Sequence, residues 1–339
     1  MKTLLHDIAQ SWYDTAPVPM GLRWLSKIFL MLIKLRRWAY RRGILKTYQA
    51  PVPVIVVGNL TVGGTGKTPA VIWLVNYLRQ AGYHPGVISR GYGGQAKNWP
   101  QWVTAHSDPR LVGDEPVLVA KRCACPVVVG PHRPDDVRCL LAKSPVDVIV
   151  SDDGLQHYAL ARNIEVVVLD GDRRFGNQYC LPAGPLREPM SRLLTVQFLL
   201  NNGGVPQQQE IAMRLNMQQA INLRDPAKRR DMASFAGERV HAVAGIGHPQ
   251  RFFNQLKSYK INIIEHEFTD HFDFTAAHFA SLENAPVLMT EKDAVKCFNF
   301  AKSHMWFVPV NAEIAASVAD QIIEQLTSLP GDINGQQIT

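Results

Sequence analysis

Apolar and polar positions succeed one another along the chain in a pattern that predicts alternating strands and helices. Short runs of β-branched residues, typical of strands buried on both faces, are separated by segments long enough for a helix. The runs are PVPVIVVGNL (51–60), PGVIS (85–89), PVVVG (126–130), VDVIVSDDG (146–154) and IEVVVLDGD (164–172). This succession predicts an α/β fold with a mostly parallel sheet.

A second, smaller α/β pattern follows a polar interruption. The stretch NNGGVPQQQEIAMRL (201–215) is rich in Gly and Gln, which favours a linker. After it come RVHAVAGIG (239–247), YKINIIEHEF (259–268), APVLMTEKDAVK (285–296) and HMWFVPV (304–310). We therefore expect an N-terminal helical segment at 1–47, a core domain at 48–200, a linker at 201–235 and a second domain at 236–330.

Residues 23–42 predict an amphipathic helix. At about 100° per residue, the basic side chains gather in one stripe about 80° wide and the apolar ones on another face. The stripe holds Arg23, Lys27, Lys34, Arg37 and Arg41, and the apolar face holds Trp24, Ile28, Met31, Leu32, Leu35 and Trp38. No uncharged run reaches the roughly 20 residues that a membrane-spanning helix needs. The pattern favours a helix lying in a membrane interface, and packing on the protein's own core is the alternative.

Composition restricts the class of protein and of partner. The 339 residues are 46% hydrophobic, which is enough for a sizeable buried core. A formal charge of +7 favours an acidic partner, such as nucleic acid, an anionic membrane or a phosphorylated substrate. The five cysteines are too few and too irregularly spaced for a disulfide framework or a zinc site, so a reducing cytoplasm is the expected compartment.

The sequence VVGNLTVGGTGKTP (56–69) predicts a phosphate-binding loop between a strand and a helix. Its glycines let the backbone curl so that successive N–H groups point at phosphate oxygens, and the helix N-terminus adds positive potential. Lys67 would reach the β- and γ-phosphates of ATP, and Thr68 would bind Mg²⁺. The residues expected to hold the nucleotide are Gly63, Gly64, Thr65, Gly66, Lys67 and Thr68. Thr61 replaces the usual first glycine, which leaves the geometry of the loop entry open.

Two adjacent carboxylates follow the apolar run at 146–151. Asp152 and Asp153 stand at the carboxyl end of the expected strand, where a sheet of this class presents its ligands. A pair of carboxylates can also cap a helix. Because a phosphate-binding loop precedes them, we favour the metal-binding interpretation. The segments SRGYGG (89–94), VGDEP (112–116) and LPAGPLREP (181–189) mix glycine with charge, and each is either a site loop or a tight turn.

Eight motifs together resemble one family, the tetraacyldisaccharide 4′-kinases, which phosphorylate lipid A precursors in Gram-negative bacteria. They are VVGNLTVGGTGKTP, SRGYGG, GDEP, SDDGLQH, LPAGPLREP, AGIGHPQRFF, FTDHFDF and TEKDAVK, and they occur here in the family's order. The resemblance spans about Val52 to Lys296 and includes an N-terminal membrane helix. It implies a P-loop NTPase-like core with a second smaller α/β domain.

The resemblance also implies a reaction and a location. The γ-phosphate of ATP would pass, with Mg²⁺, to the 4′-hydroxyl of a tetraacylated glucosamine disaccharide 1-phosphate, a membrane glycolipid. The enzyme would work at the anionic cytoplasmic face of the inner membrane, attached through its N-terminal helix, without nucleic acid and with no obligate protein partner evident. TEKDAVK would contact nucleotide from the second domain or simply begin a helix.

Roles for individual residues are carried over from the family's motifs. Asp114 would be the base for the acceptor hydroxyl, assisted by His271 from the other predicted domain. Without the resemblance, His271 would be taken as a surface histidine among acids. The remaining implied roles are catalysis for Lys67 and Asp153, nucleotide binding for Arg187, metal binding for Thr68, Asp152 and Glu188, and substrate binding for Tyr92, Arg133 and His157.

Two other classes of protein remain as alternatives. A membrane-recruited ATPase that switches a protein partner often carries a lysine just before the glycine pair, where this chain has Val62. A nucleic-acid-binding module is favoured only by net charge, and the basic residues concentrate in one helix. The observation that separates the three is whether ATP turnover requires a glycolipid, a protein or DNA.

Overall fold

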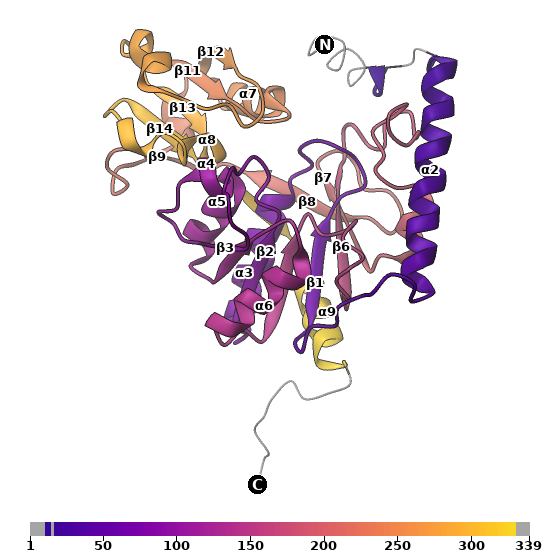
Figure 1. The fold of residues 1–339 in the computed structure, drawn as a ribbon. Helices are drawn as coiled ribbons and strands as arrows, with labels where there is room; N and C mark the ends of the chain where they lie inside the picture. The colour runs from indigo at the N-terminus through magenta and orange to yellow at the C-terminus, as the bar shows by residue number, and fades with distance from the viewer. Residues whose placement is uncertain (1–10, 15–16, 330–339) are drawn as a thin grey trace. The chain divides into compact units, whose positions relative to one another are not determined.

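The computed structural model describes residues 11–14 and 17–329. Within them the chain forms two compact units (Figure 1). The first comprises the described parts of Met1–Arg90, His132–Arg214 and Ile314–Thr339, and the second comprises Gly91–Pro131 and Leu215–Glu313. Each unit contains both strands and helices, so the predicted α/β class is confirmed.

The first unit is built on a parallel sheet whose strands lie in the order β8-β7-β6-β1-β5-β2. Their bounds are β1 Val54–Gly58, β2 Pro85–Ser89, β5 Val148–Asp152, β6 Ile164–Asp170, β7 Phe198–Asn202 and β8 Ile211–Asn216. Every position of β1, β2, β5 and β6 is buried, as their continuous apolar runs predict. Val57 of β1 pairs with Asp152 of β5, so the phosphate loop and the acidic pair leave the sheet at the same edge.

Helices pack beside this sheet. They are α3 Lys67–Gln80, α6 Arg133–Lys143 and α9 Ala316–Thr327, with the 3₁₀ turn η1 Met190–Thr195. Helix α9 belongs to the first unit although it ends the described chain, and Tyr77 of α3 donates a hydrogen bond to Asp320 of α9 at 2.8 Å. Helix α3 ends before Gly82, whose φ of 91° fits its predicted role after the helix.

The predicted N-terminal helix is α2, Met20–Arg41, the long indigo helix in Figure 1. Its buried residue is Ser26, whose hydroxyl donates to the carbonyl of Cys180 at 2.7 Å. The apolar side chains Met20, Trp24, Leu25, Ile28, Met31, Leu32, Leu35 and Trp38 are 49% to 75% exposed. Packing on the protein's own core therefore does not account for this face within the described residues. No described helix combines the length and apolarity needed to cross a bilayer.

The second unit has its own sheet, in the strand order β10-β9-β14-β13-β11-β12. The bounds are β9 Gln219–Asn222, β10 Arg229–Asp231, β11 Arg239–Ala244, β12 Asn262–Glu267, β13 Val287–Thr290 and β14 Met305–Val308. Its helices are α4 Pro109–Val112, α5 Asp114–Cys123, α7 Pro249–Ser258 and α8 Glu291–Ala294, with 3₁₀ turns η2 Met232–Phe235, η3 Ala276–Leu282 and η4 Phe298–Phe300. The unit also carries the antiparallel pair β3 Gln101–Val103 and β4 Val127–Val129, and β15 Asn311–Ile314 begins within it. Two apolar clusters of aliphatic, methionine and phenylalanine side chains form the core of this unit.

The two units revise the predicted boundaries. Residues 91–131, expected in the core domain, belong to the second unit, and helix α9, expected in the second domain, belongs to the first. The expected linker 201–235 contains β8, β9 and β10. The unit boundary falls inside β8, between Arg214 and Leu215. Hydrophobic periodicity reports local conformation, whereas unit membership depends on which distant segments pack together, and this is why the boundaries were wrong.

Candidate active site

The phosphate loop connects β1 to α3 in a conformation that glycine makes accessible. Gly66 is the residue before α3 and has φ of 95°, in the left-handed region. A Cβ atom there would lie 2.3 Å from Nδ2 of Asn202, which donates to the Thr65 carbonyl at 2.8 Å. At the other end of the loop, Nδ2 of Asn59 donates to the Thr61 carbonyl at 2.7 Å. Two buried asparagines thus hold the backbone of the loop from either end.

The segment LPAGPLREP holds the first residues of the phosphate loop in place. The sequence alone did not predict the geometry of this loop entry. Thr61 forms an antiparallel bridge with Leu186. The flanking amides complete it, because Val62 donates to the Pro185 carbonyl at 2.9 Å and Arg187 donates to the Leu60 carbonyl at 2.7 Å. The missing first glycine is therefore compensated by a second strand-like segment. The same bridge brings Arg187 to the phosphate loop.

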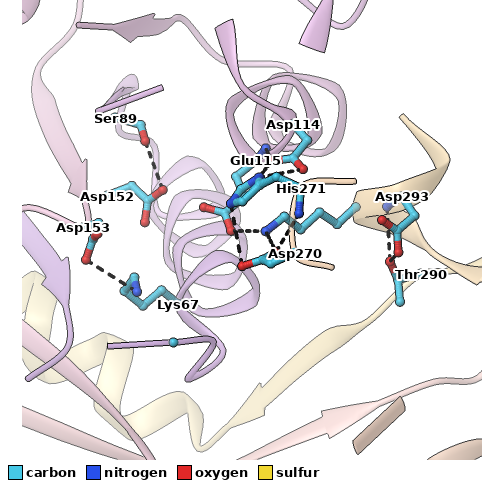
Figure 2. A network of polar contacts seen from close by, with 12 residues as sticks. Lys67, Ser89, Asp114, Glu115, Asp152, Asp153, Asp270, His271, Thr290 and Asp293 are labelled. Carbon is cyan, nitrogen blue, oxygen red and sulfur yellow. Dashed lines mark hydrogen bonds and ion pairs between the residues drawn. The ribbon is translucent and has the colours of Figure 1, made fainter. Parts of the chain in front are cut away.

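Lys67, Asp153 and Arg187 form an ion-paired group in the first unit. Lys67 Nζ lies 3.5 Å from Asp153 Oδ1, and Arg187 Nη1 lies 3.0 Å from both Asp153 oxygens (Figure 2 draws the lysine and the aspartate). Burial by itself would raise the pKa of Asp153, but the two cations lower it to about 2. Lys67 and Arg187 are thus gathered at the first turn of α3, where the helix N-terminus also favours anions.

Asp152 ends β5 beside this group. Its Oδ2 accepts a hydrogen bond from the Ser89 hydroxyl at 3.3 Å, and its backbone carbonyl accepts one from Arg133 at 3.1 Å. Arg133 is 1% exposed and also donates to Asp136 at 3.2 Å. Arg133, an expected substrate contact, therefore lies beneath the acidic turn and supports it. His157, the other expected substrate contact here, is half-buried, and burial together with Arg133 and Arg90 lowers its pKa to about 3, so its imidazole is neutral at physiological pH.

The structure does not bring Glu188 to the expected metal ligands. Its carboxylate is 1% exposed and accepts hydrogen bonds from Gln156 at 3.1 Å and from the Tyr158 hydroxyl. Arg192 and Arg37 lie 3.6 and 3.7 Å from it. Neighbouring side chains in an extended segment point to opposite sides, and here Arg187 takes the loop side. Among residues 11–14 and 17–329, no three His, Cys, Asp or Glu side chains cluster as metal ligands.

The Thr68 hydroxyl and the Asp152 carboxylate nonetheless suit Mg²⁺. Mg²⁺ prefers oxygen ligands and is usually bound by one or two carboxylates plus substrate phosphates and waters, without an all-protein cage. Thr68 is the second residue of α3, and Asp152 ends the neighbouring strand. This donor set therefore fits a magnesium ion that arrives with a nucleotide.

Asp114 and His271 meet within the second unit. Nδ1 of His271 lies 3.1 Å from each carboxylate oxygen of Asp114 (Figure 2). Asp114 is the first residue of α5, follows Gly113 with its φ of 92°, and is 3% exposed. His271 itself has φ of 58°, a left-handed conformation that is uncommon for residues other than glycine. The expectation that the two residues belong to different domains is wrong, because 91–131 packs with the later part of the chain.

Lysines from TEKDAVK surround the Asp114 carboxylate. Lys296 Nζ lies 3.7 Å from Asp114 Oδ2, and Lys292 Nζ contacts Glu115 at 2.9 Å and Asp270 at 3.1 Å. Burial would raise the pKa of Asp114, but His271 and these lysines lower it below its usual value. Burial would likewise lower the pKa of His271, and the hydrogen bond to Asp114 raises it instead. Asp114 is therefore an ionised, hydrogen-bond-accepting carboxylate at neutral pH.

Several residues of this cluster escaped the sequence analysis. Glu115, Asp270, Lys292, Lys296 and Asp293 were not assigned roles beside Asp114. Asp293 is fully buried and joins two strand ends, because it accepts hydrogen bonds from the Gly245 amide at 2.8 Å and the Thr290 hydroxyl at 2.6 Å (Figure 2 labels Thr290 and Asp293). The four-residue spacing of the two lysines in the sequence, which is typical of one helical face, is the signal that could have found them, although α8 ends at Ala294, before Lys296.

Tyr92, an expected substrate contact, packs beside His271. Its ring centroid is 5.1 Å from that of His271, and the side chain is 66% exposed. Tyr92 therefore offers an open aromatic surface beside the Asp114–His271 pair. Its position comes from the glycine-rich turn at 91–94, which is closed by a hydrogen bond from the Gly94 amide to the Gly91 carbonyl at 2.9 Å.

Comparison with known proteins identifies relatives over most of the chain. A family model described as tetraacyldisaccharide-1-P 4′-kinase, LpxK, matches residues 19–327. The tetraacyldisaccharide 4′-kinase of Nitrosococcus oceani is 52% identical over 94% of both chains, and that of Aeromonas salmonicida is 49% identical over 95% of this chain and 97% of its own. A crystal structure of LpxK from Aquifex aeolicus, described as a complex with ATP, has a TM-score of 0.74 and 26% identity, covering 89% of this chain and 97% of that one. The chain, with its phosphate loop and its paired aspartate and histidine, belongs to the tetraacyldisaccharide-1-P 4′-kinase family.

Proposed function

We propose that this protein transfers the γ-phosphoryl group of ATP to the 4′-hydroxyl of a tetraacyl glucosamine disaccharide 1-phosphate. The observation that carries the proposal is the Asp114–His271 contact at 3.1 Å. An enzyme that phosphorylates an alcohol benefits from a group that takes the hydroxyl proton, whereas a switch ATPase acts on water. A buried, ionised carboxylate joined to an imidazole is suited to that task.

The first unit supplies the groups for the nucleotide. Lys67 and Arg187 carry the positive charge that stabilises the transferring phosphoryl group, and the amides of residues 63–66 cradle the other phosphate oxygens. Thr68 and Asp152 would hold Mg²⁺, which neutralises charge on the phosphate oxygens when it is bound. Asp153 keeps both cations in place through its ion pairs. Glu188 is left out of this ligand set, because its contacts are with Gln156, Tyr158 and arginines.

The second unit supplies the groups for the acceptor. In the reaction the 4′-oxygen forms a bond to the γ-phosphorus, the bond from that phosphorus to the β,γ-bridging oxygen breaks, and ADP leaves with the electron pair. The hydroxyl proton passes to Asp114, and the hydrogen bond from His271 orients the carboxylate and shares the proton. Tyr92, beside His271, is an exposed ring on which a sugar face can pack.

We further propose that α2 attaches the enzyme peripherally to the anionic cytoplasmic face of the inner membrane. An acceptor with four acyl chains stays in the bilayer, so the enzyme must come to it. The exposed apolar side chains of α2 would enter the interface while its basic stripe meets lipid headgroups. Arg36 lies outside the basic stripe, beside the apolar face, and such a long basic side chain extends to the headgroup level in helices of this kind.

The function is tested by direct assay. The protein is incubated with radiolabelled ATP, neutral detergent and the tetraacyl disaccharide 1-phosphate, and the lipid fraction is analysed for a bis-phosphorylated product. A matched acceptor that lacks only the 4′-hydroxyl serves as control. Label in the intact acceptor and none in the control supports the proposal. ATP hydrolysis that proceeds equally without glycolipid contradicts it and favours the switch ATPase.

A further inference from the structure

A polar cavity lies at the C-terminal end of α2, within the first unit. Its volume is about 280 Å³. Arg37, Tyr40 and Arg41 of the helix line one side, and Tyr158, Arg162 and Arg192 line the other. The groups described for ATP and for the acceptor hydroxyl do not line it, so the proposed reaction leaves this cavity without a role.

The cavity carries a surplus of positive charge. Its four arginines face two carboxylates, Glu165 in the wall and Glu188 behind it, which leaves a formal surplus of two charges. Arg192 is 3% exposed and is held by Glu165, Glu188 and the Tyr158 hydroxyl. A guanidinium this deeply buried and rigidly held is built into the wall. Arg37 and Arg41 approach from the helix side, and Arg37 also lies 5.8 Å from the centre of the Tyr158 ring.

This donor set suits a phosphate group. Guanidinium groups match the oxygens of phosphate with paired hydrogen bonds. Arg162 and Arg192 already donate to protein oxygens and supply positive charge, so Arg37 and Arg41 from the helix are the guanidiniums that would meet the phosphate. The cavity is formed partly by Arg37 and Arg41 of the basic stripe of α2, and lipid phosphates are the anions that this stripe would meet at a membrane surface. The dipeptide Arg187-Glu188 connects the two regions, because Arg187 binds Asp153 beside the phosphate loop while Glu188 contacts Arg37 and Arg192.

We propose that this cavity binds a phosphate group carried by a membrane lipid. The phosphate comes either from the 1-phosphate of the acceptor or from the headgroup of a bulk phospholipid, and the same donors recognise both. The inference rests on the proposed membrane attachment through α2. It adds a specific site to what would otherwise be diffuse attraction between a basic helix and an anionic surface.

The test compares two kinds of vesicle with equal negative charge. One contains phosphatidylcholine with phosphatidylglycerol, which bears a phosphate, and the other contains phosphatidylcholine with cholesteryl hemisuccinate, which bears a carboxylate. The pocket variant is R37Q/R41Q. The matched control is R36Q/R42Q, at a residue of the same helix and the residue that follows its end, both outside the cavity lining. Each pair removes two charges, so each should weaken binding to both kinds of vesicle by about fivefold per charge.

The preference for phosphate separates the two variants. We expect the wild type and R36Q/R42Q to bind the phosphatidylglycerol vesicles about tenfold more tightly than the hemisuccinate vesicles, as charge-assisted hydrogen bonds would produce. R37Q/R41Q should lose that preference, and R37K/R41K should regain only part of it because lysine lacks the planar fork. If the wild type binds both kinds of vesicle equally, the proposed phosphate site is overturned while the membrane attachment through α2 stands. Binding to neither overturns the membrane attachment and the pocket together.

Kinetics in neutral detergent identify the source of the phosphate. If the acceptor's own 1-phosphate occupies the cavity, R37Q/R41Q raises the KM for the acceptor about tenfold with kcat unchanged, and R36Q/R42Q does not. If a bulk headgroup occupies it, the KM in detergent stays the same and only the vesicle preference is lost. Stabilisation of the wild type by inorganic phosphate, without any effect of either lipid, would overturn the assignment to a lipid.

Discussion

The Nδ1 atom of His271 lies 3.1 Å from both carboxylate oxygens of Asp114, although 157 residues separate the two in the chain. The contact forms inside one compact unit, because residues 91–131 pack with 215–313. In this contact Asp114 is the first residue of helix α5, and His271 has a positive φ. Lys292 and Lys296 complete a buried group of charges in which Asp114 stays ionised.

This contact predicts coupled losses of activity. Asp114→Ala and His271→Ala should each lower kcat by roughly 10²–10⁴-fold, the range for removal of a general base, with little change in ATP affinity. The double variant should be scarcely slower than the poorer single one, because a proton pathway broken at one member gains nothing from the other. Steady-state kinetics and calorimetric titration with ATP measure both quantities. Losses that multiply, or a fully active His271→Ala enzyme, would return His271 to the role of a surface histidine.

The same pair predicts a pH dependence of stability. The folded-state pKa of His271 is raised, so its contribution is complete below the unfolded value of about 6.5 and is lost as the pH rises through the folded value. The pKa of Asp114 is lowered, so its contribution is present above about 3.9 and is lost as the pH falls through the folded value. The pair therefore stabilises most between these limits.

Thermal unfolding of His271→Gln measures this dependence. The difference in Tm between the wild type and this variant should be larger near about pH 5.5 than near about pH 8.5. Asp114→Asn serves as the partner variant, and placing His271→Gln in that background should have a much smaller pH-dependent effect. A difference in Tm that is constant across this range would exclude an ionic contact between the two residues.

The Lys67→Ala enzyme should lose turnover but should still bind ATP. The substitution removes a charge that faces the transferring phosphoryl group. Loss of one preorganised donor of this kind lowers kcat on the order of 10²–10³-fold. The backbone amides and the helix N-terminus remain, so ATP should still bind. Lys228→Ala, at a side chain 68% exposed, is the control and should behave as the wild type. Normal turnover of Lys67→Ala would mean that this loop does not hold the reacting phosphate.

Two glycines of the phosphate loop provide a matched pair of alanine substitutions whose effects on the free energy of unfolding can be compared. Gly66→Ala should lower the free energy of unfolding by at least about 1–2 kcal/mol, the cost of a left-handed conformation for an ordinary residue. Its new methyl group would also lie 2.3 Å from Asn202 Nδ2 and disturb the bond to Thr65. Gly64→Ala meets nothing within 4 Å and should unfold like the wild type. Denaturant titration compares the two, and equal stabilities would contradict the loop conformation described here.

The exposed face of α2 predicts a loss of membrane binding without a loss of stability. Ile28, Met31 and Leu35 are 50%, 60% and 57% exposed, so replacing all three with Gln removes little packing in the folded protein. Full burial of such a side chain is worth about 1.5–3 kcal/mol, so vesicle binding should weaken by more than roughly tenfold.

Substitutions at other exposed apolar positions control for this effect. Leu194→Gln and Val205→Gln, at side chains 87% and 84% exposed, should leave vesicle cosedimentation unchanged. Membrane association that survives the three replacements in α2 would rule out the helix as the interfacial anchor. A large drop in Tm for the same variant would indicate instead that this face packs within the protein.

Local sequence pattern determined the individual elements and the phosphate loop. The runs at 51–60 and 85–89 form the buried strands β1 and β2, and the helix after Lys67 begins and ends where its glycines indicate. These features depend on periodicity, propensity and backbone freedom, which act over a few residues. The amphipathic helix at 20–41 was found for the same reason.

Only the tertiary structure decided which distant groups share a site. Periodicity cannot show that 91–131 joins the later unit, that Glu188 faces Tyr158 and Arg192, or that Lys296 approaches Asp114. Each of these contacts joins an element to others whose packing a local pattern does not describe. The pKa values of Asp114 and His271 depend on burial and on charges from residues far along the chain. These pKa values are therefore shifted only once the second unit has folded.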